Sequence, residues 1–180
     1  MTARKILLAA LTVTAALSLA ACSSNNDTAA TNTSVAAASE VDDQAAANKH
    51  IMERFTSEFL PAGDPTLAEE FIDPNIVMFF GGPQQQGRDS YLAIVHANSE
   101  AFPDLKWTVE DMVSEGDTVA VRYTMNGTQE GVFAGVQPTG RAVTAQSMAF
   151  YKLENGRIIE ERAQLDMLTL MQQMGAILTA

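Results

Sequence analysis

The clearest strand pattern of the chain lies in residues 142–166, AVTAQSMAFYKLENGRIIEERAQLD. Apolar side chains recur at about every second position on both sides of Asn155-Gly156, a dipeptide that favours a tight hairpin turn. Successive side chains of a strand point to opposite faces, so this period gives each strand one face that can be buried. The stretch therefore predicts a β-hairpin with strands at about 142 to 153 and 157 to 166.

The same period of two continues upstream. Residues 105 to 114 and 117 to 127 carry it on either side of the turn Glu115-Gly116-Asp117, and predict a second hairpin. An earlier apolar run from Ile76 to Phe80 ends at Gly81 and predicts a further strand. These segments together predict a curved antiparallel sheet.

Helical spacing of apolar residues predicts helices before the meander at about 45 to 60 and 89 to 102. Between them, Asp64 followed by Pro65 is typical of an N-cap with proline at the first helical position, and predicts a short third helix through Phe71. A last apolar segment, Met167 to Leu178, is expected to fold back on the sheet. The fold class is α+β: a cone-shaped α+β barrel in which three N-terminal helices cover a curved antiparallel sheet. A sheet closed in this way leaves a conical cavity, which is a default place for a small molecule.

The N-terminus has the features of a bacterial lipoprotein export signal. Arg4 and Lys5 precede an apolar run that ends in Leu19-Ala20-Ala21-Cys22, which is a lipobox. The run is shorter than the roughly 20 residues that a bilayer-spanning helix needs. We therefore expect residues 1–21 to be a signal peptide that is removed, and the thiol of Cys22 to receive a lipid.

The segment that follows the lipobox predicts a spacer. Residues 22–44 are mostly Ser, Asn, Asp, Thr and Ala, and cannot bury enough apolar surface to order themselves. They are expected to form a disordered tether between Cys22 and a single domain at 45–180. Because Ser23, not aspartate, follows the cysteine, the expected location is the cell envelope, at the periplasmic face of the outer membrane.

The charge of the chain excludes some partners. Removal of the leader with its two basic residues leaves 9 basic residues against 22 acidic ones, a formal net charge of −13. An acidic protein is a poor ligand for nucleic acid and for anionic headgroups. Attachment to the membrane is therefore expected to rest on lipidated Cys22 alone.

The second half of the domain carries a series of short motifs. They are Ala-Phe-Pro-Asp-Leu at 101–105, Glu-Gly-Asp at 115–117, Pro-Thr-Gly-Arg at 138–141, Asn-Gly-Arg-Ile at 155–158 and Leu-Met-Gln-Gln-Met-Gly at 170–175. In these motifs the chain resembles the SnoaL-like polyketide cyclase (ester cyclase) family, whose members have the nuclear transport factor 2-like fold. The sequence departs from the family pattern at Arg162, where the family often has tryptophan.

The resemblance implies a cofactor-free aldol-type cyclase or isomerase with one acid/base residue. The family's catalytic aspartate falls on Asp166, at the end of the last strand. A carboxyl group can do this work if burial raises its pKa toward neutrality. The alternative is structural, because aspartate at a strand-to-helix junction is a common N-cap, and backbone N–H groups would lower its pKa.

The predicted substrate-binding residues depend on strand register. Strand parity places Arg162 and Gln164 on the face of Asp166. A two-residue turn at Asn155-Gly156 would pair Asp166 with Ala145, and a three-residue turn with a glycine bulge would pair it with Thr144. We favour the second turn, because it places a set of side chains in the cavity. This set is Gln146, Met148 and Phe150, with Phe79 or Phe80 and Arg122 as further neighbours.

No spacing in the sequence would assemble a metal, haem, Ser-His-Asp or Cys-His site, so no cofactor and no metal are expected. His96 lies on a predicted helix and is expected to be a packed or surface side chain. Three function classes remain open. They are an enzyme acting on an apolar or carbonyl-bearing small molecule, a lipid-anchored protein that binds such a molecule without turnover, and an interaction module that dimerises through an exposed sheet face.

Overall fold

The computed structural model describes residues 42–177. The expected signal peptide, Cys22 and most of the expected tether lie outside these described residues. The first helix spans residues 42–54 and continues as the π-helix η1 (Phe55–Phe59), so it begins within the last residues of the segment expected to be disordered. Within the described range, no helix has the length and apolar character that crossing a membrane requires.

The fold is α+β, as predicted, with a curved six-stranded sheet. In chain order the strands are β1 (Ile72–Phe79), β2 (Gln85–Gln86), β3 (Lys106–Glu115), β4 (Thr118–Thr128), β5 (Ala142–Glu154) and β6 (Arg157–Leu165). They are arranged in the order β2-β1-β6-β5-β4-β3. β3 to β6 form the expected meander. The sheet is nevertheless not wholly antiparallel, because β1 pairs with β6 in parallel.

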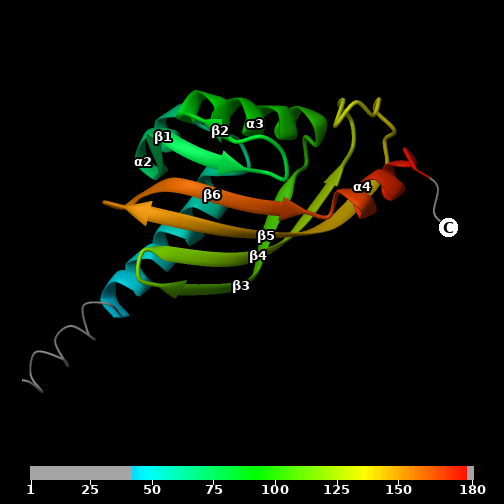
Figure 1. Cartoon of the computed structure of the whole chain (residues 1–180). Coiled ribbons are helices and arrows are strands. Elements are labelled where there is room, and N and C mark those ends of the chain that lie inside the picture. Colours follow the sequence, from blue (N-terminus) through cyan, green and yellow to red (C-terminus); the bar gives the residue numbers. More distant parts are fainter. Residues whose placement is uncertain (1–41, 178–180) are drawn as a thin grey trace, which may run out of the picture.

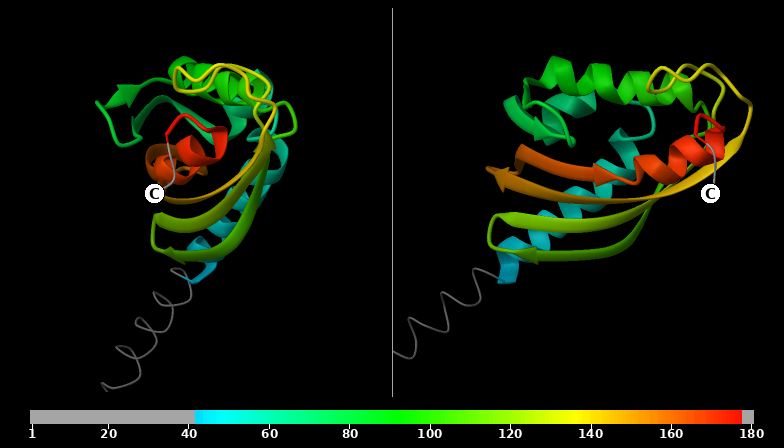
Figure 2. Two further views of the ribbon diagram at one scale, coloured as in Figure 1. Left: turned by 90° about the vertical axis from the view of Figure 1, so that its right-hand side faces the viewer. Right: turned by 45° about the vertical axis from the view of Figure 1, so that its right-hand side comes forward.

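The described residues contain four helices rather than three. The helix at 42–59 and α2 (Pro65–Phe71) come before β1, and α3 (Arg88–Ala101) comes before β3. The fourth helix, α4 (Met167–Met174), follows β6 directly, where the sequence predicted a segment folding back. Figures 1 and 2 show α3 lying across from the curved sheet, with α4 at one end of the space between them.

The concave face of the sheet holds the main core. Side chains of the first helix, among them Met52, Phe55 and Phe59, are fully buried there against β4 and β5. Alternate residues of β5 are buried without interruption from Val143 to Leu153, and the residues between them are exposed. The odd-numbered side chains of β5 therefore point into the molecule.

The hairpin between β5 and β6 departs from both expected registers. Asn155 and Gly156 have φ values of 51° and 77°, which is the two-residue turn with positive φ at both positions. The favoured three-residue turn is therefore wrong. A β-bulge then shifts the register within β6, because Leu153 pairs with Ile158 whereas Lys152 pairs with Glu160.

The bulge decides which side chains of β6 face the interior. Ile158 points inward before it, and Glu161 points inward after it, with two residues between them instead of one. Downstream of the bulge, the N–H of Asp166 donates to the carbonyl oxygen of Gln146 at 2.9 Å, not to Thr144 or Ala145. One extra residue thus determines which carboxyl group of β6 is buried.

Candidate active site

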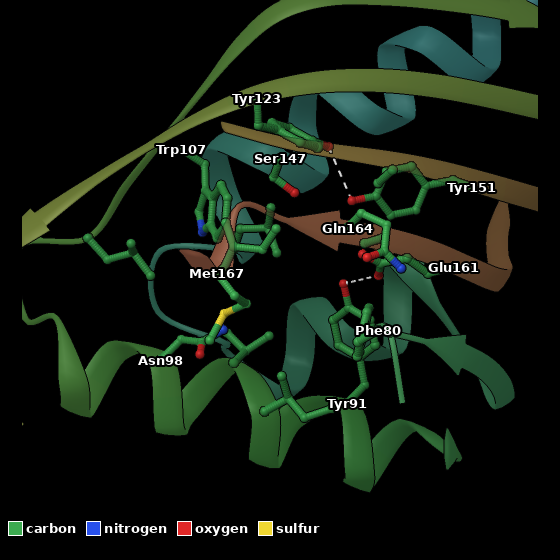
Figure 3. A pocket seen from close by; sticks show the side chains of 18 residues that line it. Phe80, Tyr91, Asn98, Trp107, Tyr123, Ser147, Tyr151, Glu161, Gln164 and Met167 are labelled. Carbon is green, nitrogen blue, oxygen red and sulfur yellow. Dashed lines mark hydrogen bonds between the residues drawn. The ribbon is translucent and has the colours of Figure 1, made fainter. Parts of the chain in front are cut away.

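A cavity of about 430 Å³ lies between α3, the concave face of β3 to β6 and the start of α4. This volume is near the lower end of the usual range for small-molecule sites. Its walls are mostly aromatic and aliphatic, and of the described residues that line it only Glu161 carries a charged side chain. Figure 3 shows Glu161 at one side of the cavity together with Tyr91 and Tyr151.

Glu161 is a buried carboxyl group without a cationic partner. Its exposed fraction is 5%, and no salt bridge among the described residues involves it. The hydroxyl group of Tyr91 donates to its Oε2 atom at 2.6 Å. Burial raises the pKa of Glu161 to about 7, although the hydroxyl groups of Tyr91 and Tyr151 partly oppose this by favouring the charged form.

Three buried tyrosines surround this carboxyl group. The hydroxyl of Tyr123 donates to that of Tyr151 at 3.3 Å and lies 3.4 Å from the hydroxyl of Thr56. Burial raises the pKa of Tyr123 to about 12, and it raises the pKa values of Tyr91 and Tyr151 well above 10. The tyrosines therefore stay protonated at neutral pH and can act as hydrogen-bond donors.

This arrangement has the properties of an acid/base site. A carboxyl group with a pKa near neutrality is present in both protonation states at physiological pH, so it can accept a proton and return it. A strongly perturbed carboxyl group in a cavity is also a recognised mark of functional sites. Among residues 42–177, no group of three or more His, Cys, Asp or Glu side chains could hold a metal ion.

Asp166 is not among the residues that line the cavity. It is exposed and forms the N-cap of α4, where its Oδ1 accepts the N–H of Thr169 at 3.0 Å and its Oδ2 accepts the Thr169 hydroxyl at 2.7 Å. These two bonds hold the pKa of Asp166 below its ordinary value, and the bond from the Thr169 hydroxyl has the larger effect. The capping alternative is therefore the arrangement that the structure shows.

Most of the predicted substrate-binding side chains lie on the outer face of the sheet. Met148 and Phe150 were expected inside, but their exposed fractions are 62% and 58%. Gln146 and Arg122 are on the same outer face, where Arg122 pairs with Asp111 at 2.6 Å and donates to Gln146 at 3.3 Å. The placement of these residues in the cavity was wrong, because only odd-numbered residues of β5 face inward.

The two predicted residues of β6 differ in position. Arg162 lies on the outer side, stacked 3.9 Å from the ring centre of Phe79 and bonded to Glu160 at 2.7 Å. Gln164 borders the cavity, together with Phe80. His96 is an exposed side chain of α3, within the expectation of a packed or surface residue, and its Nε2 atom lies 2.9 Å from the carbonyl oxygen of Gly63.

The residues that the sequence analysis missed are Glu161, Tyr91 and Tyr151. A usable signal was present in β5, where Val143, Ala145, Ala149, Tyr151 and Leu153 form the more apolar of the two alternating sets. That set identifies the inner face and places Tyr151 on it. The inward position of Glu161 depends on the bulge, for which the strand pattern gave no signal.

Comparisons with known proteins agree with this geometry. The family model of the SnoaL-like polyketide cyclases matches residues 50–174. A protein of Jannaschia sp. CCS1 assigned to the SnoaL-like polyketide cyclases is 28% identical, with a TM-score of 0.70 and coverage of 75% of this chain and 96% of that one. IdmH of Streptomyces antibioticus, assigned as a polyketide cyclase, is 29% identical, with a TM-score of 0.64 and coverage of 71% and 98%.

The similarity to a third solved structure supports the fold alone, because the sequence identity is low. AclR of Streptomyces galilaeus, assigned as a hydroxylase, is 24% identical, with a TM-score of 0.67 and coverage of 75% of this chain and 85% of its own. No curated protein matches the sequence. Since the family model covers well over half of the chain, including every strand of the sheet, the chain belongs to the SnoaL-like polyketide cyclase family.

Proposed function

We propose that this protein is a cofactor-free acid/base enzyme that acts on a carbonyl-bearing small molecule in the cavity, with Glu161 as the acid/base residue. The observation that carries the proposal is a carboxyl group on the wall of a cavity, which is 5% exposed and has no cationic partner among residues 42–177. Burying such a group is costly, and function is a common reason for keeping it. The reaction class that fits is cyclisation or isomerisation.

The proposed chemistry needs only one proton carrier. The carboxylate of Glu161 takes a proton from the carbon next to a carbonyl group, and the electron pair of that C–H bond moves into an enolate. The carboxylic acid so formed then returns the proton, either to carbon in an isomerisation or to the alkoxide formed in an aldol closure. No oxidant, reductant or metal is consumed.

Asp166 is the acid/base residue that the family resemblance implies, and this role stays a prediction. Glu161 is favoured over it for two reasons. Asp166 would have to give up its hydrogen bonds to Thr169 before reaching a ligand. Its lowered pKa also makes it a weaker base than a carboxylate whose pKa is about 7.

The experiment is hydrogen–deuterium exchange at the carbon next to the carbonyl of 1-tetralone, a neutral two-ring ketone, in D₂O. Wild-type protein should accelerate the exchange, and Glu161→Gln should reduce the acceleration by about 10²- to 10⁴-fold. Asp166→Asn is the matched control, because asparagine can still cap α4. Loss of exchange in Asp166→Asn with full exchange in Glu161→Gln would reverse the assignment.

A second candidate function is binding without turnover. It is favoured by the hydrogen bonds that Glu161 already accepts, since a carboxyl group satisfied by tyrosine hydroxyls can also be a structural part of a buried network. Retention of 1-tetralone by the protein, without any acceleration of exchange by wild type or by Asp166→Asn, would identify this second function.

We also propose that the protein is anchored in the cell envelope through a lipid on Cys22, at the periplasmic face of the outer membrane. The lipobox Leu19-Ala20-Ala21-Cys22 supports this. Replacement of Cys22 by serine should abolish incorporation of a palmitate analogue and leave the precursor uncleaved. Continued labelling of the variant would show that the leader has another role.

The outer face of the sheet is the proposed homodimer surface. Met148, Phe150 and Val113 are all more than half exposed there, at 62%, 58% and 65%. Large apolar side chains exposed close together often mark an interface. Analytical ultracentrifugation of wild type and Phe150→Ser tests this, because an interface through this face should be weakened by the substitution, whereas a monomeric wild type would contradict it.

A further inference from the structure

The cavity has a second polar end, opposite Glu161. Trp107 of β3, Asn98 of α3 and Ser147 of β5 line the cavity. Figure 3 shows Trp107 and Asn98 on the side away from Glu161 and Tyr91, with Ser147 between the two groups. The ring of Trp107 is held by an edge contact with Tyr123, with ring centres 5.8 Å apart.

The polar atoms at this end have no hydrogen-bond partner among residues 42–177. Every fully buried side-chain nitrogen or oxygen in the described part of the chain has a hydrogen bond. No such bond involves the indole N–H of Trp107, the hydroxyl of Ser147 or the amide of Asn98 within that part, although Ser147 is only 6% exposed. The three residues line the cavity, so a ligand that enters must satisfy their polar groups or leave them desolvated at a cost.

The type of these groups restricts the ligand. An indole nitrogen can only donate a hydrogen bond, so the ligand atom that faces Trp107 has to be an acceptor. Hydroxyl and amide groups can donate to the same atom. No Lys, Arg or His is among the described residues that line the cavity, and the only charged side chain among them, Glu161, is acidic. A carboxylate or phosphate would therefore be desolvated without a counter-charge, which is strongly unfavourable.

We propose that Trp107, Ser147 and Asn98 form the recognition end of the cavity, which binds a neutral carbonyl oxygen of the ligand and selects uncharged carbonyl compounds over carboxylates. This role rests on the function proposed above, because it assumes that the cavity is the binding site. The two ends of the cavity then have different roles. The recognition end binds the carbonyl oxygen of the ligand, and Glu161 at the other end exchanges the proton.

The test uses the full-length protein carrying Glu161→Gln, so that binding is measured without acid/base chemistry. Trp107 is the only tryptophan of the chain, and its indole N–H gives a single signal in a ¹H–¹⁵N spectrum. The probes share one ring system: 1-tetralone, its hydrocarbon tetralin, and 1,2,3,4-tetrahydro-1-naphthoate. We expect 1-tetralone to move the indole proton downfield, and tetralin to give no such shift.

The dissociation constants complete the test. Adding Trp107→Phe, which keeps an aromatic ring but removes the donor, should weaken binding of 1-tetralone about five- to tenfold and leave that of tetralin unchanged. The carboxylate should bind at least about tenfold more weakly than the ketone. Equal weakening of ketone and hydrocarbon, equal binding of ketone and carboxylate, or no binding of the ketone would overturn the inference. The first two of these outcomes would leave the proposed acid/base function intact if wild type still catalyses hydrogen–deuterium exchange. The recognition end and the acid/base function can therefore fail separately.

Discussion

Replacement of Glu161 by glutamine should change how the stability of the protein depends on pH. The carboxyl group ionises at about 7 in the folded protein, against an ordinary value of 4.5. Between these two pH values the folded state keeps a proton that the unfolded state has lost, so the free energy of unfolding falls as the pH rises. This contribution is fully present below pH 4.5 and is lost as the pH rises through about 7.

The size of the effect follows from the two pKa values. The difference between 4.5 and about 7, at about 1.36 kcal/mol for each pKa unit, corresponds to about 3 kcal/mol. Glutamine has nearly the same shape and no charge, so Glu161→Gln should lack this pH dependence. Between pH 4 and pH 8 the free energy of unfolding of the variant should therefore rise by about 3 kcal/mol relative to that of wild type. This change is independent of any difference in stability between the two proteins at pH 4.

The assay is urea unfolding of both proteins at several pH values, with the difference in the free energy of unfolding plotted against pH. Contributions of the other carboxyl groups cancel in this difference. The control is Glu160→Gln on the same strand, which removes a partly exposed pair with Arg162 and should cost under about 1 kcal/mol. A difference for Glu161→Gln that stays constant within about 0.5 kcal/mol over this range would show that the pKa of Glu161 is not raised in the folded protein.

Three further predictions concern stability and are measured by the same urea unfolding. Asp166→Ala should cost about 1 kcal/mol and Asp166→Asn much less, because only alanine removes the helix cap; equal costs would contradict the capping role. Phe150→Ser should change the monomer's stability by less than about 0.5 kcal/mol, whereas Phe55→Ala should cost about 3 to 5 kcal/mol, because only Phe55 is buried. Gly131→Ala should cost about 1 to 3 kcal/mol, since its Cβ would collide with the backbone at the end of α3, while Gly82→Ala, with open space around it, should be nearly neutral; similar results for the two glycines would disprove this packing.

Most strands and helices could be predicted because they follow a period of the sequence. Alternation over 142–153 and 157–166 predicted β5 and β6 to within a residue or so. Apolar residues at helical spacing predicted the first helix and α3, and the N-cap Asp64 followed by Pro65 predicted α2. The parallel pairing of β1 with β6 could not be predicted in this way, because it depends on contacts between segments distant in the chain.

The candidate site could be predicted only in part. Met148 and Phe150 are large apolar side chains that were expected inside, yet they belong to the less apolar of the two alternating sets of β5, and that set is exposed. The position of Glu161 depends on the extra residue in β6 after the turn, which reverses the alternation. Only the structure reveals that bulge, and with it the buried carboxyl group.

An NMR titration of the side-chain carboxyl carbon of Glu161 in the folded protein would show directly whether this group can act as an acid and a base at neutral pH. We expect a midpoint near 7, because burial disfavours the charged form of the carboxyl group. The Glu161→Gln variant assigns the signal, which should be missing from its spectrum. A midpoint near or below 4.5 would mean that the group is ionised throughout the physiological range, and would contradict its role as the acid/base residue.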